Sequence, residues 1–465
     1  MAHWLFWHEK RGADFVFIPQ VLFAFAILGS VVWFLVILDG RPITRVLRRC
    51  GVCTNLPSKD ILLVAVIVED VLQILLSAVA EEGNPFRSPG SAANALTALY
   101  DTLIKLAEFW DDYSDPRASL LEQRLHTLKG HSDEVTCVAA FPSGDLVVSG
   151  SGLKDTAVNV WNCTTGQKLH SLQGHQDRVT CVATLPSGRA VSGSVDKTLV
   201  VWNCTRGHRV HKLQAHTDRV TCVATLPSGE MAVSGSRDKT LVVWNVITGQ
   251  KLHTLEGHTE PVTCAAALST KYRAVSGSKD KTLMVWNCAT GKQLCVLEGH
   301  KHKVSCVAAL PVGLRAVSGS HDKTVIAWDC ATGQRLHRFE GHGDRVTCVA
   351  ALPAGDLAVS GSWDGMVMVW NCSTGQHLHT LQGHLDAVTC VAALPTGDTV
   401  ISGGKDETLL VWNCKTAQKL HKLQGHWDGV TCVAPLPSGE RAVSGSLDDT
   451  SIVWKCKTVF DYTVL

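Results

Sequence analysis

Residues 341–382 read GHGDRVTCVAALPAGDLAVSGSWDGMVMVWNCSTGQHLHTLQ, and the chain contains eight copies of this pattern with small changes. A His begins each copy, and the intervals from one such His to the next are 44, then 41, then five times 42 residues. In every copy an Asp stands six residues before a Trp. A repeat of this length is typical of one four-stranded propeller blade, and the rigid spacing from Asp to Trp indicates a fixed geometry.

Each copy predicts four short strands without a helix between them. VTCVAAL is rich in β-branched residues and ends at a Pro-Ala-Gly turn, after which LAVSGS forms a second strand. The run before the Trp is apolar throughout, which suits a strand covered on both faces, and QHLHTL is a half-exposed fourth strand. Such a sheet cannot bury both faces alone, so neighbouring units must stack, and a ring of them leaves few exposed edges.

These motifs resemble the WD-repeat (G-protein-beta-like) β-propeller family. Gly-His, Ser-Gly-Ser-x-Asp and Trp-Asn or Trp-Asp recur at the family's spacing over residues 120–456. The departures are small: Ala precedes His216, Lys455 follows the last Trp, and the first unit has two extra residues before its Asp. The resemblance implies an all-β domain that is an eight-bladed WD-repeat β-propeller.

The resemblance also implies a structural tetrad inside each blade. In the family, the His, the Ser of the second strand, the Asp of the turn and the Trp of the third strand form a hydrogen-bonded chain. Because eight copies of a Ser-His-Asp set indicate architecture rather than a hydrolytic triad, we expect no enzymatic activity. The implied tetrads are His131, Ser149, Asp155, Trp161; His175, Ser192, Asp196, Trp202; His216, Ser234, Asp238, Trp244; His258, Ser276, Asp280, Trp286; His300, Ser318, Asp322, Trp328; His342, Ser360, Asp364, Trp370; His384, Ser402, Asp406, Trp412; and His426, Ser444, Asp448, Trp454.

Closure of the ring involves the two ends of the predicted propeller domain, residues 120–465. The family commonly completes its last blade with a strand from the start of the domain, and RLHTLK at 124–129 has the pattern of a fourth strand without a preceding blade. We therefore predict that 124–129 closes the last blade. The alternating VFDYTVL at 459–465 is an alternative for the same edge.

Residues 1–117 predict an α-helical transmembrane region before the propeller. The segment 15–38 contains no charged residue, and as a helix it would be about 36 Å long, enough to cross a hydrocarbon core of about 30 Å. The basic segment 40–60 places that side of the span in the cytoplasm. Apolar stretches at 61–80 and 95–110 are possible further spans. Either one span or three spans would leave the propeller facing the cytoplasm, and we favour three spans.

Two pairs of residues in this region have a functional and a plain interpretation. Glu69 and Asp70 lie near the centre of the 61–80 stretch, where carboxylates need a partner or a polar cavity. They are either an interhelical structural pair or part of the path of a membrane channel. Cys50 and Cys53 beside the first span are candidates for lipidation or two incidental thiols.

Composition argues against several functions. The formal net charge of +1 argues against general binding of nucleic acid. Most of the 18 cysteines occupy two equivalent positions of the repeat, so we interpret them as buried free thiols of a protein in a reducing compartment. The His and Cys residues do not recur in metal-like clusters. We therefore expect no cofactor and no metal.

A second His recurs in the fourth strand of the repeat. We interpret it as edge-strand packing or as part of a solvated face. The positions are His126, His170, His211, His253, His337, His379 and His421, with Cys295 in the remaining unit.

The copies differ most just before the turn Asp and shortly after the Gly-His pair. In the resembled family these places lie on one rim of the disc, the usual partner-binding face. Here they are basic with two Trp, which suits an acidic segment of a partner protein, although variable charged loop tips are also common without such a role. The candidate rim residues are Arg178, Arg219, Arg237, Lys279, Lys301, Lys303, His321, Arg345, Trp363, Lys405 and Trp427.

The sequence thus predicts an integral membrane protein whose cytoplasmic propeller is a scaffold for protein–protein interactions. One alternative is a small membrane channel or transporter-like component that uses Glu69 and Asp70, with the propeller as a regulatory domain. Another is a substrate-receptor adaptor for a modifying enzyme, which would require an additional docking motif.

Overall fold

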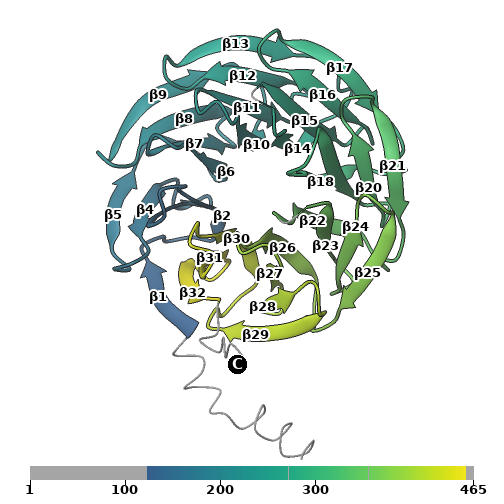
Figure 1. The fold of residues 1–465 in the computed structure, drawn as a ribbon. Helices are drawn as coiled ribbons and strands as arrows, with labels where there is room; N and C mark the ends of the chain where they lie inside the picture. Colours follow the sequence, from purple (N-terminus) through teal and green to yellow (C-terminus); the bar gives the residue numbers. More distant parts are fainter. Residues whose placement is uncertain (1–122, 271, 354, 457–465) are drawn as a thin grey trace, which may run out of the picture. The chain divides into compact units, whose positions relative to one another are not determined.

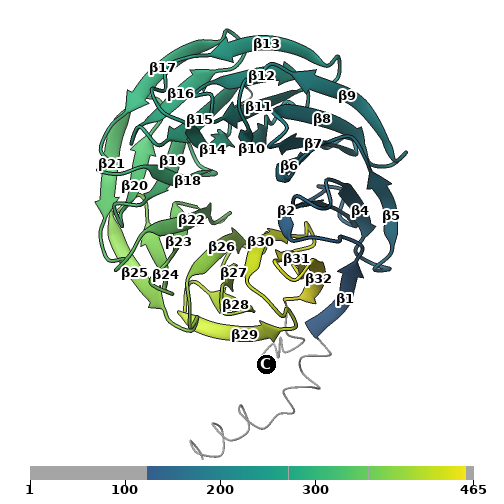
Figure 2. The same cartoon turned by 180° about the vertical axis from the view of Figure 1, so that it is seen from behind.

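The computed structural model describes residues 123–456 apart from positions 271 and 354. These residues form 32 strands in eight four-stranded antiparallel sheets, which are arranged as a ring of blades (Figures 1 and 2). In each blade the first strand lies nearest the centre of the ring and the fourth lies outermost (Figure 1). The eight-bladed propeller predicted from the sequence is confirmed.

Blades 1 to 4 follow one another along the chain, each with its strands in order from inner to outer. Their strands are, for blade 1, β2 (Val135–Ala140), β3 (Leu146–Ser151), β4 (Val158–Asn162) and β5 (Lys168–Leu172); for blade 2, β6 (Val179–Thr184), β7 (Arg189–Ser194), β8 (Thr198–Asn203) and β9 (His208–Gln214); for blade 3, β10 (Val220–Thr225), β11 (Met231–Ser236), β12 (Leu241–Asn245) and β13 (Gln250–Leu255); and for blade 4, β14 (Val262–Ala267), β15 (Arg273–Ser278), β16 (Leu283–Asn287) and β17 (Lys292–Leu297).

Blades 5 to 8 continue the same order, except that the outer strand of blade 8 comes from the start of the domain. Their strands are, for blade 5, β18 (Val304–Ala309), β19 (Arg315–Ser320), β20 (Val325–Asp329) and β21 (Gln334–Phe339); for blade 6, β22 (Val346–Ala351), β23 (Leu357–Ser362), β24 (Val367–Asn371) and β25 (Gln376–Leu381); for blade 7, β26 (Val388–Ala393), β27 (Thr399–Gly404), β28 (Thr408–Asn413) and β29 (Gln418–Gln424); and for blade 8, β30 (Val430–Pro435), β31 (Arg441–Ser446), β32 (Thr450–Lys455) and β1 (Arg124–Lys129).

Blade 6 illustrates how the repeat produces its sheet. The register of β22 and β23 places Ala350 opposite Val359. The two middle strands are almost entirely buried because neighbouring blades cover both of their faces, and this burial explains why VMVWN in β24 begins with an unbroken apolar run. Val359 belongs to one core cluster with Val400 and Trp412 of blade 7. The hydrophobic core therefore lies between the blades, and no blade has a core of its own.

The ring is closed by β1, which pairs antiparallel with β32 and places Thr127 opposite Ile452. Leu128 of this strand is fully buried in a cluster with Trp161 of blade 1 and Val453 of blade 8. The strand at 124–129 thus occupies the edge of β32. The alternative segment, 459–465, lies outside the described residues.

A second closure runs through the inner strands. In each, the hydroxyl group of the second residue donates a hydrogen bond to the first backbone carbonyl oxygen of the next inner strand, as Thr347 Oγ1 does to Val388 O at 2.6 Å. Thr431 of blade 8 donates to Val135 O of blade 1, so these bonds form a closed ring. The other donors are Thr136, Thr180, Thr221, Thr263, Ser305 and Thr389.

The predicted spans at 15–38, 61–80 and 95–110 lie outside the described residues. So do Glu69, Asp70, Cys50 and Cys53. Between residues 123 and 456, positions 271 and 354 aside, the structure has no helix that is long and apolar enough to cross a membrane.

Candidate functional site

Each blade contains a continuous chain of side-chain hydrogen bonds. In blade 6, Trp370 Nε1 donates to Ser360 Oγ at 2.8 Å, Ser360 Oγ lies 2.8 Å from His342 Nε2, and His342 Nδ1 lies 3.0 Å from Asp364 Oδ2. The same chain is complete in the other seven blades, with Trp–Ser distances of 2.7–2.9 Å, Ser–His distances of 2.7–2.8 Å and His–Asp distances of 2.7–3.1 Å. Every tetrad implied by the sequence is therefore brought together.

The chemistry of the tetrad fixes the direction of its hydrogen bonds. An indole N–H can only donate, so Ser360 Oγ accepts from Trp370 and its own proton is free for His342 Nε2. His342 Nδ1–H then donates to Asp364, and every group is satisfied with a neutral imidazole. Burial lowers the pKa of His342, which favours the same neutral form.

The tetrads do not resemble a working hydrolytic site. The Ser side chains are fully buried, and their hydroxyl groups are occupied by the Trp and the His. A nucleophile must reach its substrate, and these hydroxyl groups cannot. The Ser-His-Asp sets therefore serve the fold.

The tetrad Asp also anchors the two loops at one end of its blade. Asp364 Oδ2 accepts from the backbone N–H of Gly343 at 2.7 Å, and its Oδ1 accepts from that of Met366 at 2.8 Å. Burial raises the pKa of the Asp364 carboxyl group, but the hydrogen bonds from Met366, His342 and Gly343 outweigh it and the pKa is lowered. The anionic carboxylate therefore holds the loops after the His and before the third strand.

These anchored loops bring two variable side chains of each blade together. The backbone N–H of Trp363 donates to the carbonyl oxygen of Arg345 at 3.1 Å, and the equivalent bond occurs in every blade, where Gly152 takes part in the longer loop of blade 1. We call the residues joined in this way the rim. The rim pairs are Glu134 and Gly152, Arg178 and Val195, Arg219 and Arg237, Pro261 and Lys279, Lys303 and His321, Arg345 and Trp363, Ala387 and Lys405, and Gly429 and Leu447.

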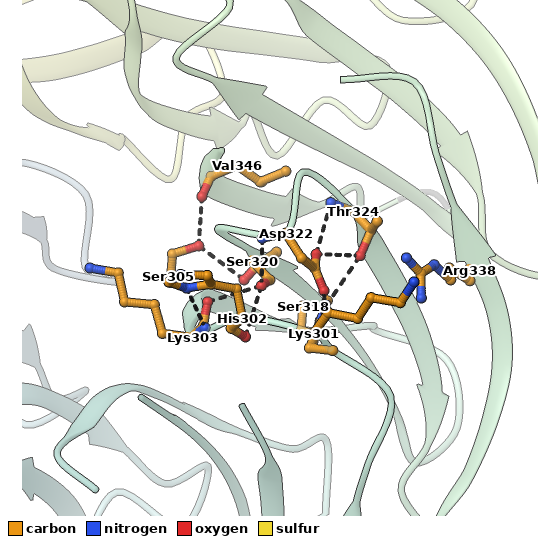
Figure 3. A network of polar contacts seen from close by, with 12 residues as sticks. Lys301, His302, Lys303, Ser305, Ser318, Ser320, Asp322, Thr324, Arg338 and Val346 are labelled. Carbon is orange, nitrogen blue, oxygen red and sulfur yellow. Dashed lines mark hydrogen bonds and ion pairs between the residues drawn. The ribbon is translucent and has the colours of Figure 1, made fainter. Parts of the chain in front are cut away.

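Most of the residues predicted for a binding face belong to these pairs, but two do not. Lys301 and Trp427 directly follow the tetrad His, and their backbone N–H groups donate to Asp322 and Asp448. In Figure 3 the Lys301 side chain extends towards Arg338 of the outer strand, whereas Lys303 extends in the opposite direction. The structure thus places Lys301 on the outer side of the loop.

The rim of blades 4 to 6 carries cations that are close enough to repel one another. Burial lowers the pKa of Lys303, and the nearby charges of Lys279 and Arg345 lower it further. Burial likewise lowers the pKa of His321 to about 4, with Lys303 and Arg345 contributing. His302 stacks on His321 with ring centroids 5.8 Å apart. We call these five residues the cationic sector.

The loops of blades 7 and 8 at the same end of the propeller carry three exposed apolar side chains. Leu385 and Trp427, which follow the tetrad His, are 86% and 85% exposed, and Leu447 is 38% exposed. We call these three residues the apolar sector. Leu385 was not among the predicted rim residues, although its place directly after Gly-His, where Trp427 stands in the next unit, was a signal for it.

Comparison with known proteins identifies the repeat. Eight segments match the model of the family described as WD domain, G-beta repeat, at residues 122–162, 166–203, 207–245, 249–287, 291–329, 333–371, 375–413 and 417–455. The chain belongs to the WD40 family. The computationally designed Ika8 protein, known from a crystal structure, is similar to this WD40 chain at 38% identity and a TM-score of 0.63, over 72% of this chain and 99% of Ika8. No curated protein matches the chain.

In this WD40 propeller the second His of the repeat links neighbouring blades. His337 Nε2 of blade 5 lies 3.1 Å from the carbonyl oxygen of Ser373 in blade 6. A Cβ atom at Gly375 would lie only 2.5 Å from His337 Nδ1, so the ring packs against a turn that needs Gly at its φ of +76°. The second His of the repeat therefore packs at the edge of its blade. His126, His211 and His253 make the same hydrogen bond to a backbone carbonyl oxygen of the next blade.

The cysteines of the described WD40 domain are free thiols. Burial raises the pKa of Cys137, Cys222 and Cys348 to about 11. Such thiols are protonated at neutral pH and behave as small hydrophobic side chains. Among residues 123–456 without the two undescribed positions, no group of three or more His, Cys, Asp or Glu side chains could hold a metal ion.

Proposed function

We propose that this WD40 chain is a scaffold anchored in a membrane by residues 1–117. Its propeller faces the cytosol and binds partner proteins through the rim, with the rim cations receiving acidic segments of the partner. It catalyses no reaction and binds no nucleic acid. WD40 propellers are typically interaction domains, and the proposal assigns that role to this rim.

The observation that supports this proposal is the contrast between the interior and the rim of one repeat. The tetrads are the same in all eight blades, whereas the rim pairs range from Glu134 and Gly152 to Arg345 and Trp363. Within the described part of the chain, Arg178 forms an ion pair with Glu134 at 2.8 Å, but Lys279, Lys303 and Arg345 form none. Cations without carboxylate partners beside exposed aromatic side chains are suited to an acidic partner.

The rim is tested by recovering partners of the full chain after chemical cross-linking in cells, with identification by mass spectrometry. Arg237→Glu combined with Arg345→Glu should reduce the recovery of specific partners about tenfold, because like charges at an interface repel. The matched control is Lys251→Glu combined with Lys292→Glu, which reverses two exposed outer-strand cations and should leave recovery unchanged. Equal recovery with both double variants would contradict binding at the rim.

The membrane orientation is tested by the accessibility of single reporter cysteines in sealed vesicles. The reporters replace positions 5, 55, 88 and 460 in a chain without Cys50 and Cys53. Labelling from outside at position 5 alone supports one span, and labelling at 5 and 88 supports three. Labelling from outside at position 460 would contradict a cytosolic propeller.

A further inference from the structure

The cationic and apolar sectors lie in neighbouring blades at the same end of the propeller, and Trp363 of blade 6 contacts cations of blades 6 and 7 between them. The guanidinium carbon of Arg345 lies 3.4 Å from the centroid of the Trp363 ring, and Lys405 Nζ lies 4.4 Å from it. Trp363 is 41% exposed, so part of its ring is free for a partner. Cation–π contacts with Arg345 and Lys405 hold the ring in place at the boundary between the sectors.

The apolar sector continues directly from Lys405. A Cβ atom built at Gly429 would lie 3.4 Å from Lys405 Cα and 3.6 Å from Leu447 Cδ1, so Lys405 and Leu447 flank this glycine. In blades 7 and 8 the position before the inner strand is Ala387 or Gly429, where blades 5 and 6 carry a long cation. Gly429 therefore has no side chain to cover the neighbouring Leu447.

Exposed Leu and Trp side chains of this extent indicate contact with another molecule. A buried Trp or Leu removes a large apolar area from water, and Trp is among the residues that dominate protein interfaces. The N–H groups of Leu385 and Trp427 are held by Asp406 and Asp448, so the tetrads fix the backbone that carries these two side chains. Less backbone order is then lost when a partner binds them.

Blade 5, at the centre of the cationic sector, lacks an acidic residue that the other blades carry. The second residue after the tetrad His is Asp or Glu in seven blades but His302 in blade 5. Burial lowers the pKa values of both Lys303 and His321 of that blade, and repulsion from neighbouring cations, Arg345 among them, lowers them further. A carboxylate placed among Lys279, Lys303 and Arg345 would relieve this repulsion, and the partner is the source of such a carboxylate.

We infer that the loops at this end of blades 4 to 8 bind one extended partner segment in which bulky apolar side chains adjoin a run of carboxylates. The apolar side chains of the segment lie on Leu385, Trp427 and Leu447, and the carboxylates lie among Lys279, Lys303 and Arg345. The inference rests on the proposed function, since it specifies the partner segment that the rim receives.

The test uses the full chain in detergent micelles and fluorescein-labelled peptides of about ten residues, with affinity measured by fluorescence anisotropy. One peptide joins a Leu-Trp pair to a run of Glu, in both orders along the chain, and the tighter order gives the direction of the segment. A second peptide has Ser in place of Leu and Trp, and a third has Gln in place of Glu. The joined peptide should bind at least about tenfold more tightly than either of the other two, because both sectors then contribute.

Variants assign each half of the peptide to its sector. Lys303→Glu with Arg345→Glu should weaken the joined peptide about tenfold or more and leave the Gln peptide unchanged. Leu385→Ser with Trp427→Ser should reduce the joined peptide to the affinity of the Ser peptide. The matched control is Lys251→Glu with Lys292→Glu on the outer strands, which should change affinity less than about twofold at physiological salt because screening acts over about 8 Å.

Three results would overturn the inference. If the outer-strand control weakens binding as much as Lys303→Glu with Arg345→Glu, charge anywhere on the propeller is sufficient. If the joined peptide binds no better than the Ser peptide, the apolar sector takes no part. If a single-stranded oligonucleotide displaces the peptide at lower concentration than unlabelled peptide does, the ligand is a nucleic acid. After either of the first two results, the proposed scaffold function still holds if the recovery of cross-linked partners depends on the rim. Loss of that dependence would contradict the scaffold function itself.

Discussion

Replacing Ser360 by Ala removes the centre of one tetrad without changing the outline of the core. Ser360 Oγ accepts from Trp370 Nε1 and bonds His342 Nε2, each at 2.8 Å, and it is fully buried. The substitution leaves an indole donor and an imidazole acceptor without partners, because His342 Nδ1–H remains bound to Asp364. A stranded buried polar group costs about 1–3 kcal/mol, so we expect the free energy of unfolding to fall by about 3 kcal/mol.

The assay is urea unfolding followed by Trp fluorescence, together with a double-mutant cycle. Trp370→Phe removes the indole donor in advance, so adding Ser360→Ala to that variant should cost about 1 kcal/mol less than it costs in the wild type. Ser373→Ala in an exposed turn is the matched control and should change stability by no more than about 0.5 kcal/mol. A cost for Ser360→Ala as small as that of the control would refute the tetrad as a source of stability.

Three further predictions follow from the fold. Burial lowers the pKa values of His131, His216 and His342 in the folded chain, so the unfolded chain binds more protons below about pH 6.5. The free energy of unfolding should therefore fall as the pH decreases from 7 to 5. A free energy that stays constant or rises over this range in urea titrations would contradict this. Leu128→Ala opens a cavity at the closing strand and should lower the free energy of unfolding by about 2–5 kcal/mol in the same assay. Leu125→Ala, at a 38% exposed position of that strand, should lower it by less than about 1 kcal/mol. Equal losses would argue against closure by this strand. Buried thiols with raised pKa values should react with iodoacetamide at pH 7 at least about tenfold more slowly in the native chain than in urea. Mass spectrometry measures the rates, and equal rates would show that the thiols are accessible in the native chain.

The blades could be predicted from the sequence because their determinants are local and repeated. The spacing of six residues from Asp364 to Trp370 recurs in every copy, and each strand is bounded by its own turn residues. The bond from Thr347 to Val388 O could not be predicted, because it joins residues 41 positions apart and depends on how two blades stack. The same holds for His337, whose partner Ser373 lies in the next blade.

The sequence predicted which residue types occur on the rim but not how their side chains are arranged. Lys301 and Lys303 are two residues apart in the sequence, yet their side chains extend in opposite directions from the loop (Figure 3). Leu385 is 86% exposed, which a count of charges and aromatic residues does not reveal. The spans at 15–38, 61–80 and 95–110 remain predictions.

The most direct test of the scaffold is to scan a photo-cross-linking amino acid over the two faces of the propeller in living cells. Position 279 belongs to the rim, whereas position 247 lies in the exposed turn between β12 and β13, at the opposite end of the antiparallel strands. We expect position 279 to cross-link to specific partner proteins and position 247 not to do so. Partners captured equally from both positions, or only from position 247, would contradict binding at the rim.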